Sequence, residues 1–296
     1  MAKIVFAVLL GLALASTTFN VGPLTSAQIE DINANSGWTA SSEFLEGKTE
    51  EEISALTGTH IVPNPFPKKS FGALLDHVST PDAFDSRTQW PGCVHSILNQ
   101  QQCGSCWAFG ASEALSDRYC VQKQVNVVLS PQWLVSCDSG NMGCNGGWLP
   151  VAWSYLQSHG IPTQTCTPYT SGGGNTGSCS STCSNGSAPT FYKADNLGAL
   201  DSPSAIQMEV MKGGPVETAF TVYQDFFSYT GGIYKHTYGG VAGGHAVKIV
   251  GWGNQSGTSY WIVANSWGTN WGLSGFFWIA FGQCGIDTDA YAGDAA

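Results

Sequence analysis

The sequence predicts an α+β protein in which a helical lobe precedes a lobe of short strands, with a functional cleft between the two. Segments with helical spacing of apolar residues lie between residues 105 and 156, and short β-like runs split by glycines lie between residues 231 and 280. At 296 residues and 43% hydrophobic, the chain is also long and apolar enough to bury a large core.

The expected helical lobe contains three helices. Ser105 is placed to cap the first, which we expect to run to about Tyr119. Two shorter helices are predicted over residues 130–135 and 150–156. The first helix carries an apolar stripe that should be buried, formed by Trp107, Ala108, Ala111, Ala114, Leu115 and Tyr119.

The expected strand lobe contains β-like runs at residues 231–234, 245–252, 260–265 and 275–280. Turns containing glycine separate these runs, a pattern typical of a closed antiparallel sheet. We expect the helical lobe to lie mainly in residues 92–185 and the strand lobe mainly in residues 186–290. No internal repeat relates the two lobes.

The first 15 residues have the pattern of a removable secretion signal. Lys3 supplies a positive charge, residues 4–14 are apolar but too short to span a bilayer, and Ala13-Leu14-Ala15 resembles a signal-peptidase site. No later segment of about twenty apolar residues exists, so we predict no membrane span. The expected location is the secretory pathway, ending in an acidic lysosome-like vesicle or outside the cell.

Residues 16–79, which we call the leader, differ in composition from the remainder. The leader has no cysteine, an acidic run at residues 50–52 and a turn-rich segment at residues 63–67, whereas the chain from Pro81 onward is rich in cysteine, glycine and tryptophan. This contrast predicts a propeptide, with a mature domain at residues 80–296. The alternative is a flexible tail, although the leader has apolar residues able to anchor it in a groove, namely Trp38, Phe44, Leu45, Ile53 and Leu56.

The charge of the chain excludes two classes of partner. The formal net charge is -10 and only 11% of residues are charged, so the sequence has no basic surface for nucleic acid or for an anionic membrane. From residue 80 the chain has 7 Lys+Arg against 13 Asp+Glu, a net charge of -6. Because falling pH protonates carboxylates, acid-triggered loosening of the leader is a working hypothesis.

Ten cysteines are compatible with disulfides in a secreted protein. If Cys106 is a free thiol, an odd number remains and at least one more cysteine must be unpaired. Cys284 stands apart from the others in an apolar, glycine-rich tail, so a buried, free Cys284 is the simplest solution. Spacing alone does not determine how the remaining eight pair.

The segment Gln100–Phe109 places Cys106 at the start of the first predicted helix. A cysteine attacks a carbonyl only as the thiolate, and a thiol with a pKa of about 8.5 is mostly protonated at neutral pH. A helix N-terminus and a neighbouring imidazolium both stabilise the anion. His245, which follows Gly243-Gly244 where the backbone can approach closely, is the candidate imidazole.

Two further groups complete the expected chemistry. Asn265 can accept a hydrogen bond from His245 and fix its tautomer, and Trp267 can shield that bond from water. The backbone N–H of Cys106 and the side-chain amide of Gln100 can donate to the oxyanion of a tetrahedral intermediate. The other histidines, His60, His77, His95, His159 and His236, have no comparable setting and are expected to be structural or solvated.

These residues resemble the papain family of cysteine proteases, in which a Cys-Gly-Ser-Cys-Trp segment precedes a distant His and Asn. Here His245 and Asn265 lie 139 and 159 residues after Cys106. Ordered segments that include Trp90–Cys93, Gly143–Gly147, Gly214–Glu217 and Gly243–Ala246 are most similar to the cathepsin B-like branch. The resemblance covers residues 16–296 and implies a papain-like fold with the active site between the lobes. It also implies a monomer without metal or cofactor that acts on peptides and proteins.

The resemblance also implies roles for individual residues. The implied disulfides are Cys93–Cys120, Cys103–Cys144, Cys137–Cys179 and Cys166–Cys183. The implied substrate-binding groups are the backbones of Gly146 and Gly147, together with Gly244. A pocket for the second residue before the cut is implied for Trp148, Leu149, Ala246 and Asp289, and a leaving side for Trp267, Val222 and Phe227. The leader is implied to lie in the cleft in reverse direction as an inhibitor, and cystatin-type and epoxysuccinyl inhibitors are expected to bind.

The chain departs from this branch at two places. Only twelve residues separate Cys166 from Cys179, and no histidine occurs between His159 and His236, so the occluding loop that makes relatives dipeptidyl carboxypeptidases is missing. We therefore expect an endopeptidase with little carboxydipeptidase activity. In addition, Asp289 occupies the position of a pocket glutamate, which predicts a mixed preference for arginine and large apolar groups.

Three alternatives are weighed against this interpretation. A Cys-x-x-Cys pair can be a redox site or half a zinc site, but no second such pair or His pair follows. A secreted, non-catalytic binding protein on the same scaffold is possible in principle, yet Gln100, Cys106, His245 and Asn265 are all retained.

The sequence also contains two N-glycosylation sequons, at Asn185 and Asn254, and it leaves open whether either is glycosylated.

Overall fold

The computed structural model describes residues 22–63, 65–69, 71 and 79–296. The predicted secretion signal and His77 lie outside these residues. The helices are α1 (Ser26–Asn35), α2 (Glu50–Ser54), α4 (Ser86–Gln89), α5 (Cys106–Lys123), α6 (Pro131–Cys137), α7 (Leu149–Ser158) and α8 (Pro203–Gly213), with short 3-10 helices η1 (Glu43–Leu45), η2 (Gly143–Asn145), η3 (Ser171–Gly173), η4 (Gln224–Ser228) and η5 (Gln283–Gly285). The strands are β1 (Trp38–Ala40), β2 (Phe84–Asp85), β3 (Ala194–Leu200), β4 (Val216–Tyr223), β5 (Tyr229–Tyr234), β6 (Val241–Gln255), β7 (Thr258–Ala264), β8 (Phe276–Ala280) and β9 (Ala290–Ala295).

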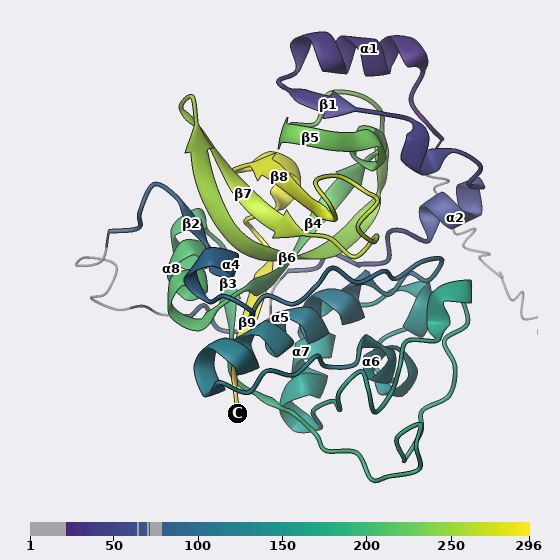
Figure 1. The fold of residues 1–296 in the computed structure, drawn as a ribbon, viewed down its shortest axis with the longest axis vertical. Coiled ribbons are helices and arrows are strands. Elements are labelled where there is room, and N and C mark those ends of the chain that lie inside the picture. The colour runs from purple at the N-terminus through teal and green to yellow at the C-terminus, as the bar shows by residue number, and fades with distance from the viewer. Residues whose placement is uncertain (1–21, 64, 70, 72–78) are drawn as a thin grey trace, which may run out of the picture.

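The two expected lobes are present (Figure 1). The helical lobe is formed by α5, α6 and α7, and the β lobe is formed by the curved sheet around β4–β8 (Figure 1). Each lobe has its own cluster of buried apolar residues. The leader follows one edge of the β lobe with α1, β1 and α2 and then passes between the lobes (Figure 1).

The long helix α5 is more deeply buried than predicted. Every residue from Cys106 to Cys120 is buried, so the expected apolar stripe is in fact a helix enclosed on all sides. Its polar residues are paired across the lobe boundary: Asp117 bonds the Lys248 ammonium of β6 at 2.6 Å, and Arg118 bonds Glu209 of α8 at 2.5 Å. The small residues of α5 allow close packing on both sides, which periodicity alone does not show.

The predicted helix boundaries differ from the observed ones at several ends. Helix α5 continues to Lys123, four residues beyond Tyr119, and Ser105 precedes it without a side-chain capping bond. The Ser105 hydroxyl instead contacts the Tyr169 hydroxyl at 3.1 Å. The two shorter helices are present as α6, capped by Ser130, and α7. Helix α8, which Ser202 caps, was not predicted.

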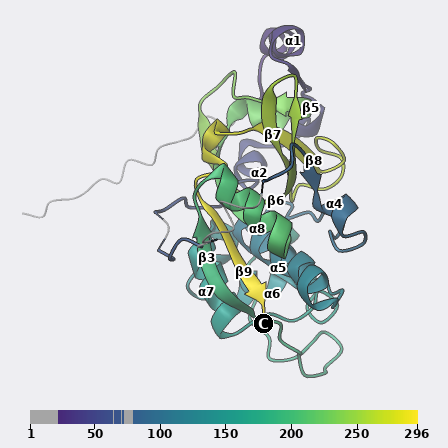
Figure 2. The ribbon, with the colours of Figure 1, turned by 90° about the vertical axis from the view of Figure 1, so that its left-hand side faces the viewer.

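The sheet contains the four predicted β-runs together with strands that the sequence did not indicate. Among the described residues the strand order is β1-β5-β8-β7-β6-β4-β9-β3, and β2 pairs with β6. The pairs are antiparallel except β5 with β8, which is parallel and therefore departs from the expected pattern. Figure 2 shows β3 and β9 side by side next to α8, so β3 is the edge strand on that face.

The leader is part of this architecture. Capping boxes begin its helices, with Thr25 and Gln28 at α1 and Thr49 and Glu52 at α2. Strand β1 pairs with β5 of the β lobe, so the leader extends the sheet. Four of its five predicted anchors, Trp38, Leu45, Ile53 and Leu56, are buried within the β-lobe core, and the fifth, Phe44, packs against that core.

Candidate active site

Cys106 is the first residue of α5 and is completely buried. The helix N-terminus directs free backbone N–H groups and a positive dipole end toward this residue. The neighbouring Cys103 forms a disulfide with Cys144, which fixes the chain just before the helix. Local structure thus places a free thiol at the start of a helix.

His245 lies in β6, where it pairs with Phe220 of β4. Its Nε2 is 2.7 Å from Oδ1 of Asn265, and the Trp267 ring covers the imidazole at a centroid distance of 4.8 Å. Because Asn265 Oδ1 accepts, the proton is on Nε2. The buried Nδ1 has no hydrogen-bond partner, which leaves its lone pair free to accept a proton.

Gln100 is held in place from both sides. Its Nε2 donates to the Cys103 carbonyl at 3.0 Å, and its Oε1 accepts from the Ser266 hydroxyl at 2.7 Å. The sequence analysis did not assign Ser266 a role, since nothing in its local pattern distinguishes it from other serines. By holding the amide oxygen, Ser266 turns the amide nitrogen of Gln100 toward the start of α5.

A strand of the leader crosses these groups. The Thr59 hydroxyl is 3.1 Å from the Cys106 sulfur, and Gln100 Nε2 also donates to the carbonyls of Ala55 and Leu56, at 3.3 and 3.4 Å. The indole N–H of Trp267 donates to the Leu56 carbonyl at 3.0 Å. The leader therefore binds the thiol and the amide predicted to serve the reaction.

Backbone hydrogen bonds fix the register of this strand. Gly147 N–H donates to the Gly58 carbonyl at 2.8 Å, and the N–H of His60 donates to the Gly147 carbonyl at 2.9 Å. The N–H groups of Gly58 and Thr59 donate to the Gly244 carbonyl. The bridge between Thr59 and Gly147 is parallel, opposite to the antiparallel course implied for a substrate.

Glycines make this approach possible. A Cβ atom on Gly58 would lie 2.2 Å from the Gly104 carbonyl oxygen, and one on Gly244 would lie 2.1 Å from the Thr59 carbonyl oxygen. Real side chains do not tolerate such distances. The close contact between leader and cleft therefore requires glycine at both positions.

Burial keeps Cys106 and His245 uncharged while the leader covers them. Burial raises the pKa of the Cys106 thiol to about 11, although the Thr59 hydroxyl and the backbone of Ala246 act in the opposite direction. Burial lowers the pKa of His245 to about 4, against the effect of its bond to Asn265. Between these values the covered site holds a thiol and a neutral imidazole.

Comparison with known proteins identifies the scaffold. The family model described as "Papain family cysteine protease" matches residues 80–293. The chain belongs to the papain family of cysteine proteases. The match begins at residue 80 and ends three residues before the C-terminal Ala296.

Its relatives include cathepsin B-like enzymes. The chain is 42% identical to "Cathepsin B-like CP3" of Giardia intestinalis over 95% of this chain and 97% of that protein. It is 45% identical to a gut-specific cysteine proteinase of Caenorhabditis elegans over 73% of this chain and 74% of that protein. The solved structure of procathepsin B S9 from Trypanosoma congolense superposes with a TM-score of 0.86 and 34% sequence identity. The superposition covers 92% of this chain and 99% of the chain in that structure. This cysteine protease is therefore cathepsin B-like, and a proenzyme shares its architecture.

The disulfides that the resemblance implied are present in this papain-family chain. Cys93–Cys120, Cys103–Cys144, Cys137–Cys179 and Cys166–Cys183 are bonded, and Cys106 and Cys284 are free. Cys284 is half-buried rather than fully buried as predicted. No group of His, Cys, Asp and Glu able to hold a metal ion occurs among the described residues.

The residues implied to bind substrate occupy different environments in this protease. Gly146 lies directly below the leader, since its Cβ would meet the Gly58 carbonyl oxygen at 2.8 Å, and Trp148 packs against His60. Leu149 and Ala246 lie in the core cluster of the helical lobe. Val222 and Phe227 are fully buried in the β-lobe cluster, which also contains leader residues.

Asp289, the expected pocket acid, is 7% exposed. Burial raises the pKa of its carboxyl, against the effect of the Tyr291 hydroxyl beside it. The leader residue Phe66 packs edge-on against the Tyr291 ring at 6.0 Å. A second buried acid, Glu217, accepts from the Trp153 indole at 2.7 Å, and burial raises its pKa well above the usual range. The sequence analysis did not identify Glu217 as a neighbour of Asp289.

The remaining histidines have structural surroundings. His95 bonds Asp117 at 2.7 Å, His236 stacks on Tyr223 and His159 stacks on Tyr155. His60 is the exception because it lies in the cleft on Trp148. The sequon residues Asn185 and Asn254 are exposed. No helix in the described part of the chain has the length and apolar character needed to cross a membrane.

Proposed function

We propose that this chain is the zymogen of a cysteine endopeptidase whose reaction is performed by Cys106, His245, Asn265 and Gln100. The observation that carries the proposal is that leader residues 55–60 bind the Cys106 sulfur, the Gln100 amide and the backbones of Gly147 and Gly244 together. These are the groups that an extended peptide substrate needs. A leader in the opposite direction occupies the same groups without presenting a cleavable bond in the productive orientation.

The geometry supports the following reaction once the leader has left. His245 Nδ1 accepts the Cys106 proton, and the sulfur attacks the substrate carbonyl carbon. The Cys106 N–H and Gln100 Nε2 donate to the oxyanion. Collapse of the intermediate breaks the C–N bond, the imidazolium protonates the leaving amine, and an acyl-enzyme remains. Water then gives a proton to Nδ1 and attacks the thioester, which releases the acid and restores the thiol.

Removal of the leader is expected to change the protonation of the pair. Water reaches the cleft, so the burial that raises the pKa of Cys106 and lowers the pKa of His245 is relieved, and this outweighs the loss of the Thr59 hydrogen bond, which lowers the pKa of Cys106. The helix N-terminus then favours a thiolate beside an imidazolium. The thiolate pair is thus proposed for the mature enzyme only.

Alkylation by iodoacetamide tests this change in protonation. At neutral pH a thiol of pKa about 11 has a thiolate fraction about 300-fold lower than one of pKa 8.5. In a Cys284→Ala background we expect slow labelling of the proenzyme that accelerates only toward alkaline pH. The matured enzyme should label rapidly from mildly acidic pH upward. Equal rates and equal pH profiles for the two forms would contradict the proposal.

Endopeptidase rather than carboxydipeptidase activity is supported by the segment between Cys166 and Cys179, the position of the occluding loop in relatives. Thr170 and Ser171 donate their backbone N–H groups to Gln132 Oε1, and Ser136 and Gln132 donate to the Thr176 carbonyl. These bonds attach the segment to the helical lobe. It carries no histidine that could bind the carboxylate of a substrate C-terminus.

Matched peptides distinguish the two activities. We expect internally quenched peptides to be cleaved in the middle, with kcat/KM values within about twofold for free and amidated C-termini. A carboxylate bound by a charged partner typically contributes about 1.5–3 kcal/mol, or roughly tenfold or more in kcat/KM. A preference of that size for the free carboxylate would overturn the endopeptidase proposal.

Asp289 is proposed to bind arginine at the second substrate position. Comparison of Arg-Arg with Phe-Arg substrates should show a mixed preference, and Asp289→Ala should lower kcat/KM for the arginine substrate by about tenfold while changing the phenylalanine substrate little. Burial raises the pKa of Asp289, so its carboxylate forms at a higher pH than that of an exposed aspartate. The arginine preference should therefore increase with pH. The exposed Asp195→Asn variant is the control. An unchanged preference in Asp289→Ala would exclude the pairing.

A further inference from the structure

The leader makes a second contact with the protease, remote from the cleft. Residues 67–69 lie along the edge strand β3: Ala199 N–H donates to the Pro67 carbonyl and Lys69 N–H donates to the Ala199 carbonyl, both at 3.0 Å. The bridge between Lys68 and Ala199 is parallel. A short peptide strand is thus added to an otherwise open sheet edge.

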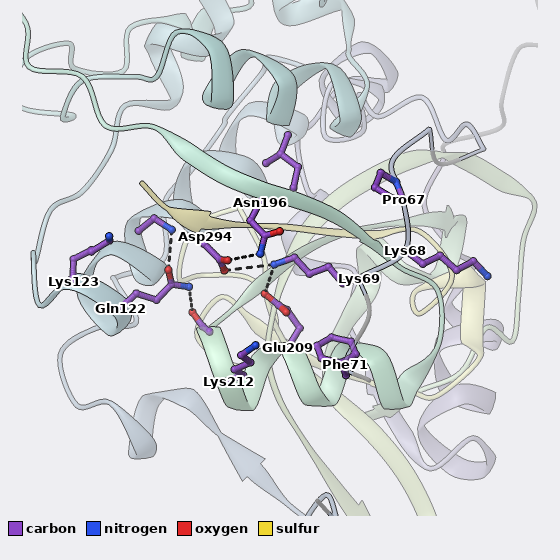
Figure 3. Close-up of a pocket in the computed structure, with 13 residues that line it drawn as sticks. Pro67, Lys68, Lys69, Phe71, Gln122, Lys123, Asn196, Glu209, Lys212 and Asp294 are labelled. Atoms are coloured by element: carbon purple, nitrogen blue, oxygen red, sulfur yellow. Dashed lines mark hydrogen bonds and ion pairs between the residues drawn. The ribbon is translucent and has the colours of Figure 1, made fainter. Parts of the chain in front are cut away.

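The Lys69 side chain lies between two carboxylates of the protease, those of Glu209 and Asp294, at this edge. Its ammonium bonds Glu209 at 2.8 Å and lies 3.5 Å from Asp294, and its side chain is only 9% exposed. Figure 3 shows Lys69 pointing between these two carboxylates, whereas Lys68 points away from them. The Lys68 side chain is 75% exposed and pairs with Asp201 at the surface.

The charges of the site balance only when a cation is bound. Arg118, completely buried, bonds Glu209 at 2.5 Å and Asp294 at 3.1 Å. Burial would raise the pKa of Glu209, but the charges of Arg118 and Lys69 outweigh it and lower that pKa. Two carboxylates therefore face two cations, one of which leaves with the leader. The exposed Lys123 and Lys212 at the rim are screened by solvent.

Shape complements charge at this site. A Cβ atom on Gly198 would lie 2.1 Å from Lys69 Cγ, so glycine is needed where the lysine stem passes. Two residues further on, Phe71 is 7% exposed and belongs to the β-lobe core. A hollow of about 620 Å³ remains beside the docked segment and is lined by residues of both the leader and the protease. The site therefore fits an extended peptide with a lysine two residues before an aromatic residue.

This site is separate from the catalytic cleft. Gln122, which lines it, lies 16 residues after Cys106 on α5, so about 24 Å of helix separates the two. Thr59 and Lys69 are ten residues apart, and an extended chain of that length reaches roughly 33 Å. One peptide can therefore occupy both sites at once, which raises its effective concentration at each.

We propose that removal of the leader uncovers a second peptide-binding site, formed by the β3 edge, Glu209, Asp294 and Gly198, that binds extended peptides with a lysine two residues before an aromatic side chain. This inference rests on the proposed maturation of the zymogen. The first ligand of the site is the enzyme's own leader, through residues 65–69 and Phe71, which stay bound after cleavage until they dissociate.

The binding test uses the matured enzyme with Cys106 blocked by an epoxysuccinyl inhibitor. Fluorescence anisotropy with a labelled peptide of sequence Pro65–Phe71 should give saturable binding. The peptide with Lys69→Gln should bind at least tenfold more weakly, and the peptide with Lys68→Gln within about twofold. On the protein, Gly198→Ala should weaken binding, whereas Gly240→Ala, whose Cβ meets nothing within 4 Å, should not. Absence of saturable binding, or equal binding of both substituted peptides, overturns the proposal.

A second measurement does not depend on maturation or on peptidase activity. In the intact zymogen, hydrogen exchange of the Ala199 amide reports whether segment 67–69 is docked. We expect Lys69→Gln to accelerate this exchange at least tenfold and Lys68→Gln to leave it nearly unchanged. If the zymogen fails to mature but this difference is found, only the proposed function is wrong. If the two variants exchange at the same rate, the proposed lysine site is refuted, whether or not the protease is active.

Discussion

Replacement of Cys106 by alanine is expected to lower kcat/KM for a peptide substrate by roughly 10⁶-fold, the order of the loss found when the nucleophile of a serine protease is removed. The reason is that the thiol at the start of α5 is the proposed nucleophile, and the buried Nδ1 of His245 has no other hydrogen-bond partner. The variant zymogen should also fail to mature by itself. Fluorogenic substrate assays after cleavage by an added protease measure the effect.

The matched control is Cys284→Ala, which removes the other free thiol. Cys284 packs beside the β-lobe core, and burial raises its pKa to about 12, so it is an unreactive thiol. We expect its removal to leave kcat/KM within about twofold. Comparable losses in the two variants, or retention of activity in Cys106→Ala, would contradict the assignment of the nucleophile.

The second large effect is expected from Gly58→Ala in the zymogen. Its new Cβ would lie 2.2 Å from the Gly104 carbonyl oxygen, where backbone faces backbone and neither side can move aside cheaply. Overpacking of this kind costs about 1–3 kcal/mol, which corresponds to roughly 5- to 150-fold in the fraction of zymogen with an open cleft. Labelling of the intact zymogen by an epoxysuccinyl probe should accelerate by that factor.

Ser54→Ala serves as the control because Ser54 is an exposed residue of the same leader segment. It should label at the wild-type rate. Thermal unfolding of both variants distinguishes local opening from loss of the fold, since only displacement of the leader leaves the protease domain intact. An unchanged labelling rate in Gly58→Ala would show that the observed register is not what closes the cleft.

Local sequence signals were sufficient to propose the reacting groups. Cys106 could be placed at a helix start, and His245 and Asn265 could be paired, because each lies beside a recognisable turn or strand. The helices α6 and α7 and the strand runs of the β lobe follow from local periodicity for the same reason. Strand β4 and helix α8 escaped prediction. The disulfide pairing came only from the family resemblance, since spacing left it open.

Tertiary structure decided how the leader meets the enzyme. The leader's apolar anchors are visible in the sequence, but the register that sets Thr59 on Cys106 and Lys69 between Glu209 and Asp294 is not. These contacts join residues 47 to 225 positions apart. No local periodicity reports a separation of that length, because it depends on how the two lobes pack.

The sequence by itself indicated the candidate chemistry of this protein: a thiol at a helix start, an imidazole with an amide to orient it, and an apolar leader ahead of a disulfide-rich body. Only the folded chain decided that α5 is buried on every side, that burial raises the pKa of the covered thiol and lowers the pKa of the imidazole, and that the leader has two separate binding sites. The physical reason is burial. Residue types fix which groups can react, while burial, which arises from packing of distant segments, fixes their charge and access.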